Sequence, residues 1–310
     1  MTVDLRVREF SWDDLDRMYQ ITMNTFPRDI ERIGFNKKTF KQKFVPFHMD
    51  KWVQKISRQV YSKVYVGEID KEVVAVTTIK RMNSAWYLSG VMVDTEYRGK
   101  GYGRKIVVNA CTNAYSFGAK RIVLHVPEKN LAAKTLYKSL GFEHFERVAR
   151  YVRDPGKVKV AFPDEVNLVR IDIFDSKALE IIDKCRPPQS VRVYRSKLPP
   201  WHIRVLLRAF RTEIMEEYAV TYNGTWVGIC NFKTERGKKG EGLVTIHVVP
   251  EYRGNGIEKA LLTWSMDKAF TLGLHQVAVK VDEKHSELVG ACETLQFISK
   301  QALEGMVKFC

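Results

Sequence analysis

The sequence predicts an α/β protein built from two tandem domains, each with a mixed sheet and flanking helices. Three observations lead to this fold class. The chain has 310 residues, of which 45% are apolar, so it can bury two cores of ordinary size. Its two halves share a long similarity without gaps. Within each half, strand-like alternation and helical spacing follow one another in the same order.

An internal repeat with a shift of 155 residues divides the chain. From Val93 to Phe142 this shift preserves 13 of 50 residues, including the run Glu-Tyr-Arg-Gly that begins at 96 and again at 251. Solenoid repeats run to roughly 20 to 50 residues, so this longer period indicates a duplicated domain. Between the copies, Pro and Gly residues interrupt the pattern. We therefore expect a first domain over 1–154, a linker over 155–165 and a second domain over 166–310.

The first part of each copy is predicted to contain an opening strand, a helix and a hairpin. Alternating residues indicate the strands, and helical spacing after Asp or Ser caps indicates the helices. Each hairpin should turn at a two-residue loop between runs rich in β-branched residues. In chain order these features are the strands at 3–10 and 166–174, the helices at 13–26 and 176–185, and the turns at Asp70-Lys71 and Asn223-Gly224.

The centre of the first copy is predicted to form a strand, a glycine-rich turn, a helix and a second strand. Residues 86–93 have a strand pattern, helical spacing follows the turn as far as Gly118, and a buried strand covers 121–126. The turn contains glycines at 99, 101 and 103. Because glycine has no Cβ, the backbone of this turn can approach a ligand closely.

A glycine-rich turn at the start of a helix is suited to a phosphate group. The first N–H groups of a helix have no intrahelical acceptor and lie at the positive end of the helix dipole. Arg98, Lys100 and Arg104 add positive charge at the same point, as a diphosphate would require. The spacing fits neither the P-loop pattern nor the dinucleotide-binding pattern GxGxxG. The alternative is a flexible basic turn without a ligand.

Charge and cysteine usage favour a basic cytoplasmic protein. The formal net charge is +15. This excess suits a nucleic acid, an acidic partner or a phosphate-bearing co-substrate, or it is only a Lys-rich solvated surface. The sequence contains no apolar run of about eighteen residues and no signal-peptide pattern, so we expect no membrane partner. The five cysteines have no metal-ligand spacing; we expect reduced thiols and no metal site.

Two motifs of the first copy resemble the GNAT N-acetyltransferases. Residues 98–103, Arg-Gly-Lys-Gly-Tyr-Gly, fit the Q/R-x-x-G-x-G/A signature, and NLAAKTLYKSLGF at 130–142 is similar to the second motif of that family. The resemblance implies acetyl-CoA as co-substrate, with its pyrophosphate on the turn and its pantetheine arm between two splayed parallel strands of a mostly antiparallel twisted sheet. The residues implied to contact acetyl-CoA are Val91, Met92, Val93, Arg98, Gly99, Lys100, Gly101, Tyr102, Gly103, Arg104 and Asn130.

The resemblance also implies groups for acetyl transfer to an amine, which needs a base for the nucleophile and an acid for the departing thiolate. Tyr137 occupies the family's general-acid position; alternatively it only packs its ring in the core. His125 lies on the second splayed strand, where an imidazole can act as the base, or it is only a packed or solvent-facing residue. Glu128 is a second candidate for the base, although its equivalent Glu283 is retained in the second copy.

The second copy departs from the motifs at the turn. Glu258 replaces Gly103, which brings a Cβ and a negative charge to a helix end that should receive a diphosphate, and His285 stands in place of Asn130. The remaining departures are Asn255 for Lys100, Cys292 for Tyr137 and Gln296 for Gly141. We hypothesise that the second copy has kept the fold and lost acetyl-CoA binding.

The expected function is that of an acetyl-CoA-dependent N-acetyltransferase, an acyltransferase that works by direct attack in a ternary complex. Its acceptor would be a primary amine, with a protein amino terminus or a lysine slightly ahead of a small amine. The alternative is a non-catalytic, acetyl-CoA-responsive module whose basic surface binds nucleic acid or protein. Residues 28–52 mix cations with aromatic side chains. Such a mixture suits a nucleic-acid site, but an amphipathic helix pair with Phe residues in the core is favoured.

Overall fold

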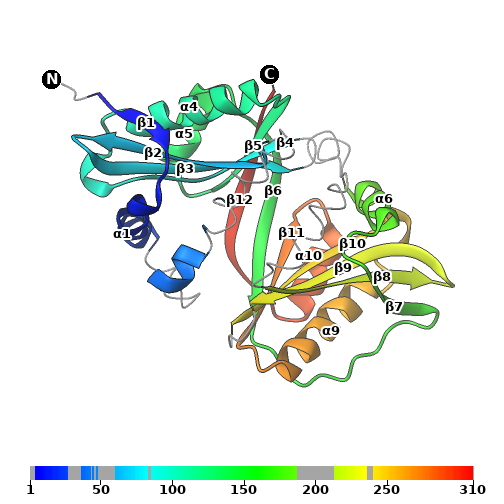
Figure 1. Ribbon diagram of the computed structural model, residues 1–310. Coiled ribbons are helices and arrows are strands. Elements are labelled where there is room, and N and C mark those ends of the chain that lie inside the picture. Colours follow the sequence, from blue (N-terminus) through cyan, green and yellow to red (C-terminus); the bar gives the residue numbers. More distant parts are fainter. Residues whose placement is uncertain are drawn as a thin grey trace. The chain divides into compact units, whose positions relative to one another are not determined.

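The computed structural model describes residues 4–26, 36–42, 44, 47, 60–82, 85–186, 213–235 and 240–309 (Figure 1). The chain groups into two compact units. The first unit comprises Met1–His125, Leu131–Glu143 and Met306–Cys310, and the second comprises Val126–Asn130 and His144–Gly305. None of the helices in the described ranges combines the length and the apolar character that crossing a bilayer requires.

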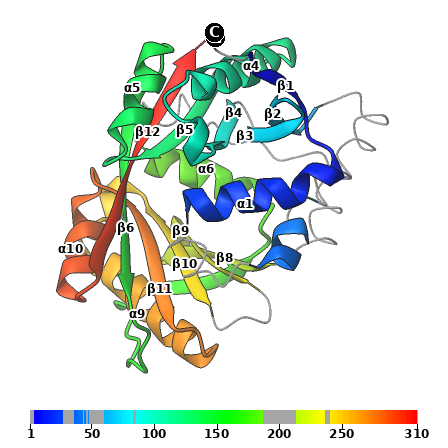
Figure 2. The same ribbon diagram turned by 90° about the vertical axis from the view of Figure 1, so that its left-hand side faces the viewer.

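The first unit is a mixed sheet with α1 and α4 on opposite faces (Figures 1 and 2). Its strands lie in the order β1-β2-β3-β4-β5, and only the pair β4 and β5 is parallel. The hairpin turn is at the predicted place, since Asp70 and Lys71 have φ values of 48° and 68°. The elements are β1 (Arg6–Glu9), η1 (Trp12–Asp14), α1 (Leu15–Thr25), β2 (Ser62–Ile69), β3 (Glu72–Met82), β4 (Ala85–Val93), η2 (Thr95–Tyr97), α4 (Tyr102–Ser116), β5 (Arg121–Pro127) and α5 (Leu131–Ser139).

The second unit repeats this arrangement, with α6 and α9 on opposite faces of its sheet (Figures 1 and 2). Its strands lie in the order β12-β6-β11-β10-β9-β8-β7, with β10 and β11 parallel. Asn223 and Gly224 form its predicted hairpin turn, with φ values of 47° and 77°. The elements are β6 (Glu143–Arg153), β7 (Val166–Ile171), α6 (Ser176–Cys185), β8 (Glu213–Tyr222), β9 (Thr225–Glu235), β10 (Glu241–Val248), η3 (Pro250–Tyr252), α9 (Ile257–Thr271), β11 (Gln276–Asp282), α10 (Ser286–Thr294) and β12 (Ile298–Phe309). The predicted α/β fold, with a mostly antiparallel sheet and one parallel pair in each copy, is confirmed.

Helical spacing decides which faces of the helices are buried. In α1, Leu15, Met18 and Ile21 are almost fully buried and pack against strand residues of the first sheet that include Val64 and Val66. In α4 the buried residues recur at the same spacing and include Ile106, Ala110 and Ala114. The sheet is therefore covered on both faces, and the start of α4 is fixed at the end of β4, where the glycine-rich turn lies.

The strand that follows each motif helix is exchanged between the copies. β6 follows α5 along the chain, yet it pairs with β11 of the second copy from Val148 to Arg153. The N–H of Glu283 donates to the carbonyl of Arg147 (3.2 Å), and the N–H of Glu128 donates to the carbonyl of Ala302 (3.0 Å). These bonds are equivalent under the 155-residue shift. The units therefore divide the chain differently from the repeat, on which the predicted boundaries at 154 and 166 rest, and those boundaries stay a prediction.

The segment at 28–52 is described only in part. Phe40 is 4% exposed and its ring lies 5.4 Å from that of Tyr19 and 4.8 Å from that of Phe44. Phe40 therefore lies in the core, as the amphipathic-helix interpretation predicts for the Phe residues. The rest of the segment, at 28–35, 43, 45–46 and 48–52, lies outside the described residues.

Candidate active site

The glycine-rich turn of the first unit is open. Gly99 and Gly101 have φ values of 77° and 81°, a left-handed conformation that glycine adopts without strain, and Gly101 caps α4. A Cβ added to either glycine would have no atom of the described residues within 4 Å. A Cβ at Gly103 would lie 3.6 Å from Cδ2 of Leu136 and 3.8 Å from Cγ2 of Val93. Gly103 therefore faces the space between α5 and the end of β4.

The start of α4 offers main-chain donors to an anion. The N–H of Lys105 bonds to the carbonyl of Gly101 (3.2 Å), so it belongs to the first regular turn of the helix. The N–H groups before it, from Tyr102 to Arg104, precede any acceptor that the helix itself could supply. Together with the positive end of the helix dipole, these donors can hold a phosphate group.

Arg98 anchors the turn to the sheet. Its Nε donates to the carbonyl of Val93 (3.0 Å), and its Nη2 lies 3.5 Å from the hydroxyl of Thr25 at the end of α1. In the second unit, Arg253 donates in the same way to the carbonyl of Val248 (3.0 Å). The same bond in both copies indicates that this arginine positions the turn, in addition to contributing charge.

The other predicted residues of the turn differ in how they can contribute. Nζ of Lys100 lies 5.1 Å above the ring of Tyr97, and Nη2 of Arg104 lies 3.5 Å from the carbonyl of Ser139. Both side chains are exposed and can reach a phosphate. Tyr102 is 4% exposed and packs in the core, so only its main chain faces the turn.

The parallel strands of the first unit part just beyond Tyr87. The register of β4 and β5 joins Trp86 to Ile122 and Tyr87 to Val123 and then ends. Beyond Tyr87, the main-chain N–H and C=O groups of β4 that face β5 therefore have no ladder partner on that strand. This stretch of β4 includes residues 91–93. A bulge opposite β3 and a φ of 60° at Gly90 mark the same region. This is the splayed pair that the resemblance implied.

Tyr87 and His125 meet where the strands part. The Tyr87 hydroxyl lies 3.1 Å from Nδ1 of His125, and the ring centroids are 5.8 Å apart. The phenol of Tyr87 can donate or accept a hydrogen bond. The hydrogen of the neutral imidazole can therefore sit on Nδ1 and be donated to the Tyr87 oxygen. In that tautomer Nε2 has a lone pair that can take a proton. Tyr87 is not among the residues predicted from the sequence; the signal for it is a polar aromatic residue on the strand that runs parallel to the strand of His125.

Tyr137 is buried and stays protonated. It is 7% exposed on α5, and its ring contacts that of Phe142 edge to face at 5.8 Å. Burial, with smaller contributions from Cys111 and Tyr87, raises the pKa of Tyr137 to about 12. The ring therefore packs in the core and the phenol keeps its proton at neutral pH, whereas its role as general acid stays a prediction.

Asn130 and Glu128 belong to the ranges of the second unit. Asn130 is exposed, and its N–H donates to the carbonyl of Pro127 (2.8 Å). The carboxylate of Glu128 accepts from Nε and Nη2 of Arg147 at 3.2 and 2.8 Å. Arg147 also forms an ion pair with Glu283, the equivalent of Glu128 in the second copy. This shared partner supports a structural role for Glu128.

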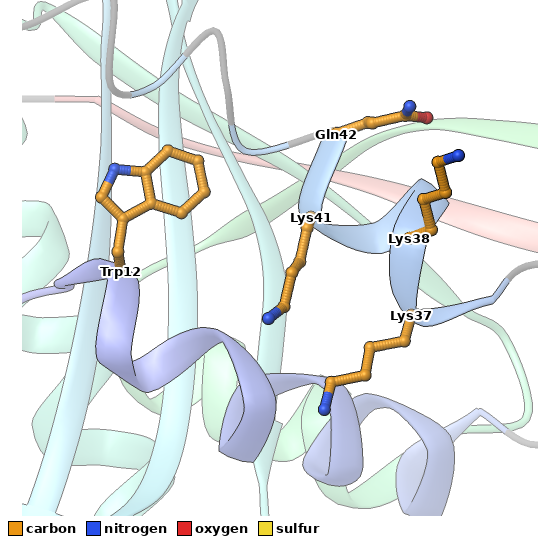
Figure 3. Close-up of a pocket in the computed structure, with 5 residues that line it drawn as sticks. All are labelled: Trp12, Lys37, Lys38, Lys41 and Gln42. Carbon is orange, nitrogen blue, oxygen red and sulfur yellow. The ribbon is translucent and has the colours of Figure 1, made fainter.

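A hollow of about 610 Å³ lies at the start of α1 (Figure 3). Two of its lysines are paired with Asp16, because Nζ of Lys37 and Nζ of Lys41 each lie 2.9 Å from that carboxylate. α1 ends at Thr25, beside Arg98, so its length separates the hollow from the glycine-rich turn by roughly 16 Å. The residues that line the hollow are Trp12, Lys37, Lys38, Lys41 and Gln42.

Cysteines and acidic residues form no metal centre in the part of the chain that the structure describes. No group of three or more His, Cys, Asp or Glu side chains there is placed to hold a metal ion. The four described cysteines, Cys111, Cys185, Cys230 and Cys292, are buried thiols.

Comparisons with known proteins agree with the motifs and with the fold. A sequence model of the Acetyltransferase (GNAT) family matches residues 15–142 and 179–294. The chain is 36% identical over 93 residues to the uncharacterized N-acetyltransferase YobR of Bacillus subtilis, a match that covers 28% of this chain and 38% of that protein. It is 34% identical over 64 residues to glucosamine 6-phosphate N-acetyltransferase of Trypanosoma brucei brucei, covering 21% and 42%. The matches thus span less than half the length of these two relatives.

A solved structure resembles the whole chain. It is a tandem GNAT protein from the clavulanic acid biosynthesis pathway, with a TM-score of 0.67 and 12% identity over 99% of this chain and 98% of that one. At this identity the likeness concerns the fold.

Proposed function

The chain belongs to the acetyltransferase (GNAT) family, and on this basis we propose that its first unit transfers an acetyl group from acetyl-CoA to a primary amine. One observation carries the proposal. The first unit combines an open glycine-rich turn at the start of α4 with a pair of parallel strands that part at Tyr87. The turn provides donors for a diphosphate, and the parted strands leave main-chain groups for the arm that carries the acetyl group.

The residues present fit acetyl-CoA. Gly99 and Gly101 have left-handed φ values and open space where a Cβ would point, and Gly103 faces the space between α5 and β4. The N–H groups at the start of α4, with Lys100 and Arg104, would hold the pyrophosphate. Val91, Met92 and Val93 would line the arm, and a main-chain N–H among them can stabilise an oxyanion. When bound, acetyl-CoA supplies an activated thioester.

His125 is the proposed base. An amine must lose a proton to become a nucleophile, and an imidazole can accept that proton. Tyr87 lies 3.1 Å from Nδ1, so it can fix the tautomer in which Nε2 is the acceptor. A protonated imidazole can in turn use Tyr87 as the acceptor for its Nδ1 hydrogen. We propose Tyr87 as a positioning residue for His125.

Tyr137 is the proposed acid. Its phenol keeps its proton well above neutral pH because burial raises its pKa to about 12. Tyr87 contributes, after burial and Cys111, to the raised pKa of Tyr137, which supports a position of the phenol near the parted strands. From there it can donate a hydrogen bond, and then a proton, to a departing thiolate. Tyr137 therefore completes the set of groups that amine acetylation requires.

The acceptor class and the cellular site are also part of the proposal. We propose a cytoplasmic enzyme that acts on a protein amino terminus or a lysine side chain ahead of a small amine. The net charge of +15 favours acidic protein partners. The acceptors to be tested include peptides and, as small amines, glucosamine 6-phosphate and free amino acids. Glucosamine 6-phosphate is included because one relative is named for it.

The test is a comparison of Tyr137→Phe with the wild-type protein. Turnover with peptide amines and acetyl-CoA should fall about 100-fold, because general acid catalysis contributes at least that much. The dissociation constant of acetyl-CoA, measured by calorimetry, should change less than threefold, because the glycine-rich turn is intact.

Tyr65→Phe is the matched control. Tyr65 is also a buried tyrosine of the first unit, and its hydroxyl has no hydrogen-bond partner among the described residues, so its loss should leave turnover unchanged. Full activity in Tyr137→Phe would remove this residue from the reaction. Binding of acetyl-CoA without turnover on any amine of the panel would favour the non-catalytic module instead.

A further inference from the structure

The turn of the second unit keeps the backbone of an anion site. Gly254 and Gly256 have φ values of 77° and 79°, within a few degrees of their equivalents Gly99 and Gly101. Gly256 caps α9 as Gly101 caps α4, and both helices have 15 residues. The main chain alone would therefore hold a phosphate as well as the first turn does. What differs is what lies around it.

Side chains cover the second turn where the first is open. A Cβ at Gly256 would lie 3.5 Å from Cγ of Pro163, and one at Gly254 would lie 3.8 Å from Cγ of Glu287. The corresponding positions at Gly101 and Gly99 have no described atom within 4 Å. Pro163 comes from the segment between the two copies. Glu287 stands in α10 where the first copy has Ala132.

The interior of the second turn is filled by an acid and a histidine. Glu258 replaces Gly103 and is 2% exposed, and His285 replaces Asn130 and is 8% exposed. Oε1 of Glu258 lies 3.2 Å from Nε2 of His285. Gly103 faces the space between α5 and β4, so a side chain at the equivalent position occupies the matching space in the second unit. Two substitutions that look like independent losses in the sequence are thus in contact.

Two acidic side chains at the second turn oppose a diphosphate. Glu258 and Glu287 both lie in the first turns of their helices, at α9 and α10. A main-chain hydrogen bond lowers the pKa of Glu287, so its carboxylate is ionised at neutral pH. A phosphate entering this turn would meet these carboxylates and would have to displace Pro163. Like charges held close together in a partly dry site repel strongly.

We infer that the second turn is an anion site closed by the chain's own side chains, with Pro163, Glu258, His285 and Glu287 as the closing residues. The chain then binds one acetyl-CoA, and the first unit binds it. This count rests on the proposed function, whereas closure of the second turn does not. Opening the second site therefore requires changes at these closing residues, and restoring the glycine motif alone would not suffice.

The experiment starts from Gly101→Glu, which closes the first turn. In this background, binding of CoA to the full chain is measured by calorimetry up to millimolar ligand. The restored variant adds Pro163→Gly together with Glu258→Gly, His285→Asn and Glu287→Ala, the last three of which are the residues of the first copy. We expect no binding in the background up to millimolar CoA. In the restored variant we expect a dissociation constant at least tenfold below that limit. Adding Gly256→Glu to the restored variant should abolish the gain.

Two results would overturn the inference. One is binding in the background that Gly256→Glu removes, because the second turn would then already be open. The other is a restored variant that does not bind CoA although it unfolds cooperatively with a melting temperature close to that of the wild-type protein. If the wild-type chain binds no CoA, the proposed function fails, and these arms still report on the second turn.

A second measurement needs no variant. The wild-type chain is irradiated with a photoreactive azido derivative of CoA, and the modified peptides are mapped by mass spectrometry. We expect labels on peptides that flank 98–104 and none on peptides that flank 253–259. Labelling of the second set that unmodified CoA suppresses would overturn the closure.

Discussion

Glu128 and Glu283, which occupy equivalent positions in the two copies, both form ion pairs with Arg147. Their main-chain N–H groups also make equivalent bonds, to the carbonyls of Ala302 and Arg147. The hydrogen bonds to Glu128 and then Glu283 raise the pKa of Arg147 above its already high ordinary value. Glu128 and its equivalent Glu283 thus make the same kind of contact with Arg147 of β6. This supports a structural role for Glu128 at the exchanged strands and argues against Glu128 as the base.

Glu128→Gln should therefore leave acetyl transfer nearly unchanged. Surface ion pairs contribute about 0.2 to 1 kcal/mol, so the free energy of unfolding in urea should fall by no more than about 1 kcal/mol. The matched control, Glu283→Gln, should have the same effect on stability. A loss of turnover of 100-fold or more in Glu128→Gln alone would make this glutamate the base in place of His125.

His125→Ala should lower turnover about 100-fold, because it removes the proposed proton acceptor. Tyr87→Phe should have a smaller effect, on the order of tenfold, because it removes only the bond that fixes the tautomer of His125. The measurement is steady-state turnover at saturating acetyl-CoA. A positioning role predicts that Tyr87→Phe has no further effect once His125 is already alanine. Additive losses in the double variant would assign Tyr87 a separate role.

Below about pH 11, turnover should not fall through deprotonation of Tyr137. A pKa raised above the ordinary 10 means that the neutral phenol of Tyr137 persists to higher pH, and the value is about 12. Turnover measured with an acceptor of low pKa should therefore stay level from pH 8 to 10.5. A decline near pH 9 to 10 that disappears in Tyr137→Phe would show that the site does not protect the phenol in this way.

The duplicated fold could be predicted because its signals are local. Asn223-Gly224 is a hairpin turn by its own backbone preference, and Gly99 and Gly101 specify left-handed positions before a helix. The exchange of β6 and β12 could not be predicted. The two strands follow equivalent helices and carry similar patterns, so the sequence does not say which copy each will pair with.

The candidate site also contains residues that the sequence predicts and residues that only the structure identifies. The turn and Tyr137 are predicted from motif spacing, whereas Tyr87 depends on the register of two strands that lie about 35 residues apart in the chain. Glu258 and His285 were each recognised as departures, but their contact appears only when α9 and α10 are packed together. Long-range register and helix packing are therefore what the sequence alone lacked.

The four described cysteines should not react with a thiol reagent in the folded protein. Burial raises the pKa values of Cys185, Cys230 and Cys292 to about 12, and Cys111 is also buried. Thiolates react and thiols do not, so these groups stay inert at pH 8. Titration of Cys310→Ser with Ellman's reagent should show no fast-reacting thiol before denaturation and four thiols after it. A thiol that reacts within seconds in the native variant would contradict this burial.

Two neighbouring acids of β8 should affect stability with opposite signs. Burial, only partly offset by a hydrogen bond from Asn231, raises the pKa of Glu217 to about 7. The folded state therefore holds a proton that the unfolded state releases at lower pH. The stability that this proton contributes is complete below about pH 4.5 and is lost as the pH rises through 7. Glu217→Gln should raise the free energy of unfolding by about 1 to 3 kcal/mol at pH 8 and change it little at pH 4.5.

Glu216→Gln is the control on the opposite face of the same strand. Burial alone would raise the pKa of Glu216, but hydrogen bonds from Lys268 and Tyr218 outweigh it and lower the pKa. Its carboxylate lies 2.6 Å from Nζ of Lys268, so its contribution is present at neutral pH and is lost as the pH falls through its lowered pKa. Glu216→Gln should therefore destabilise the protein at pH 8. A gain of stability in both variants at pH 8 would mean that removal of negative charge in general, and not burial of Glu217, sets the effect.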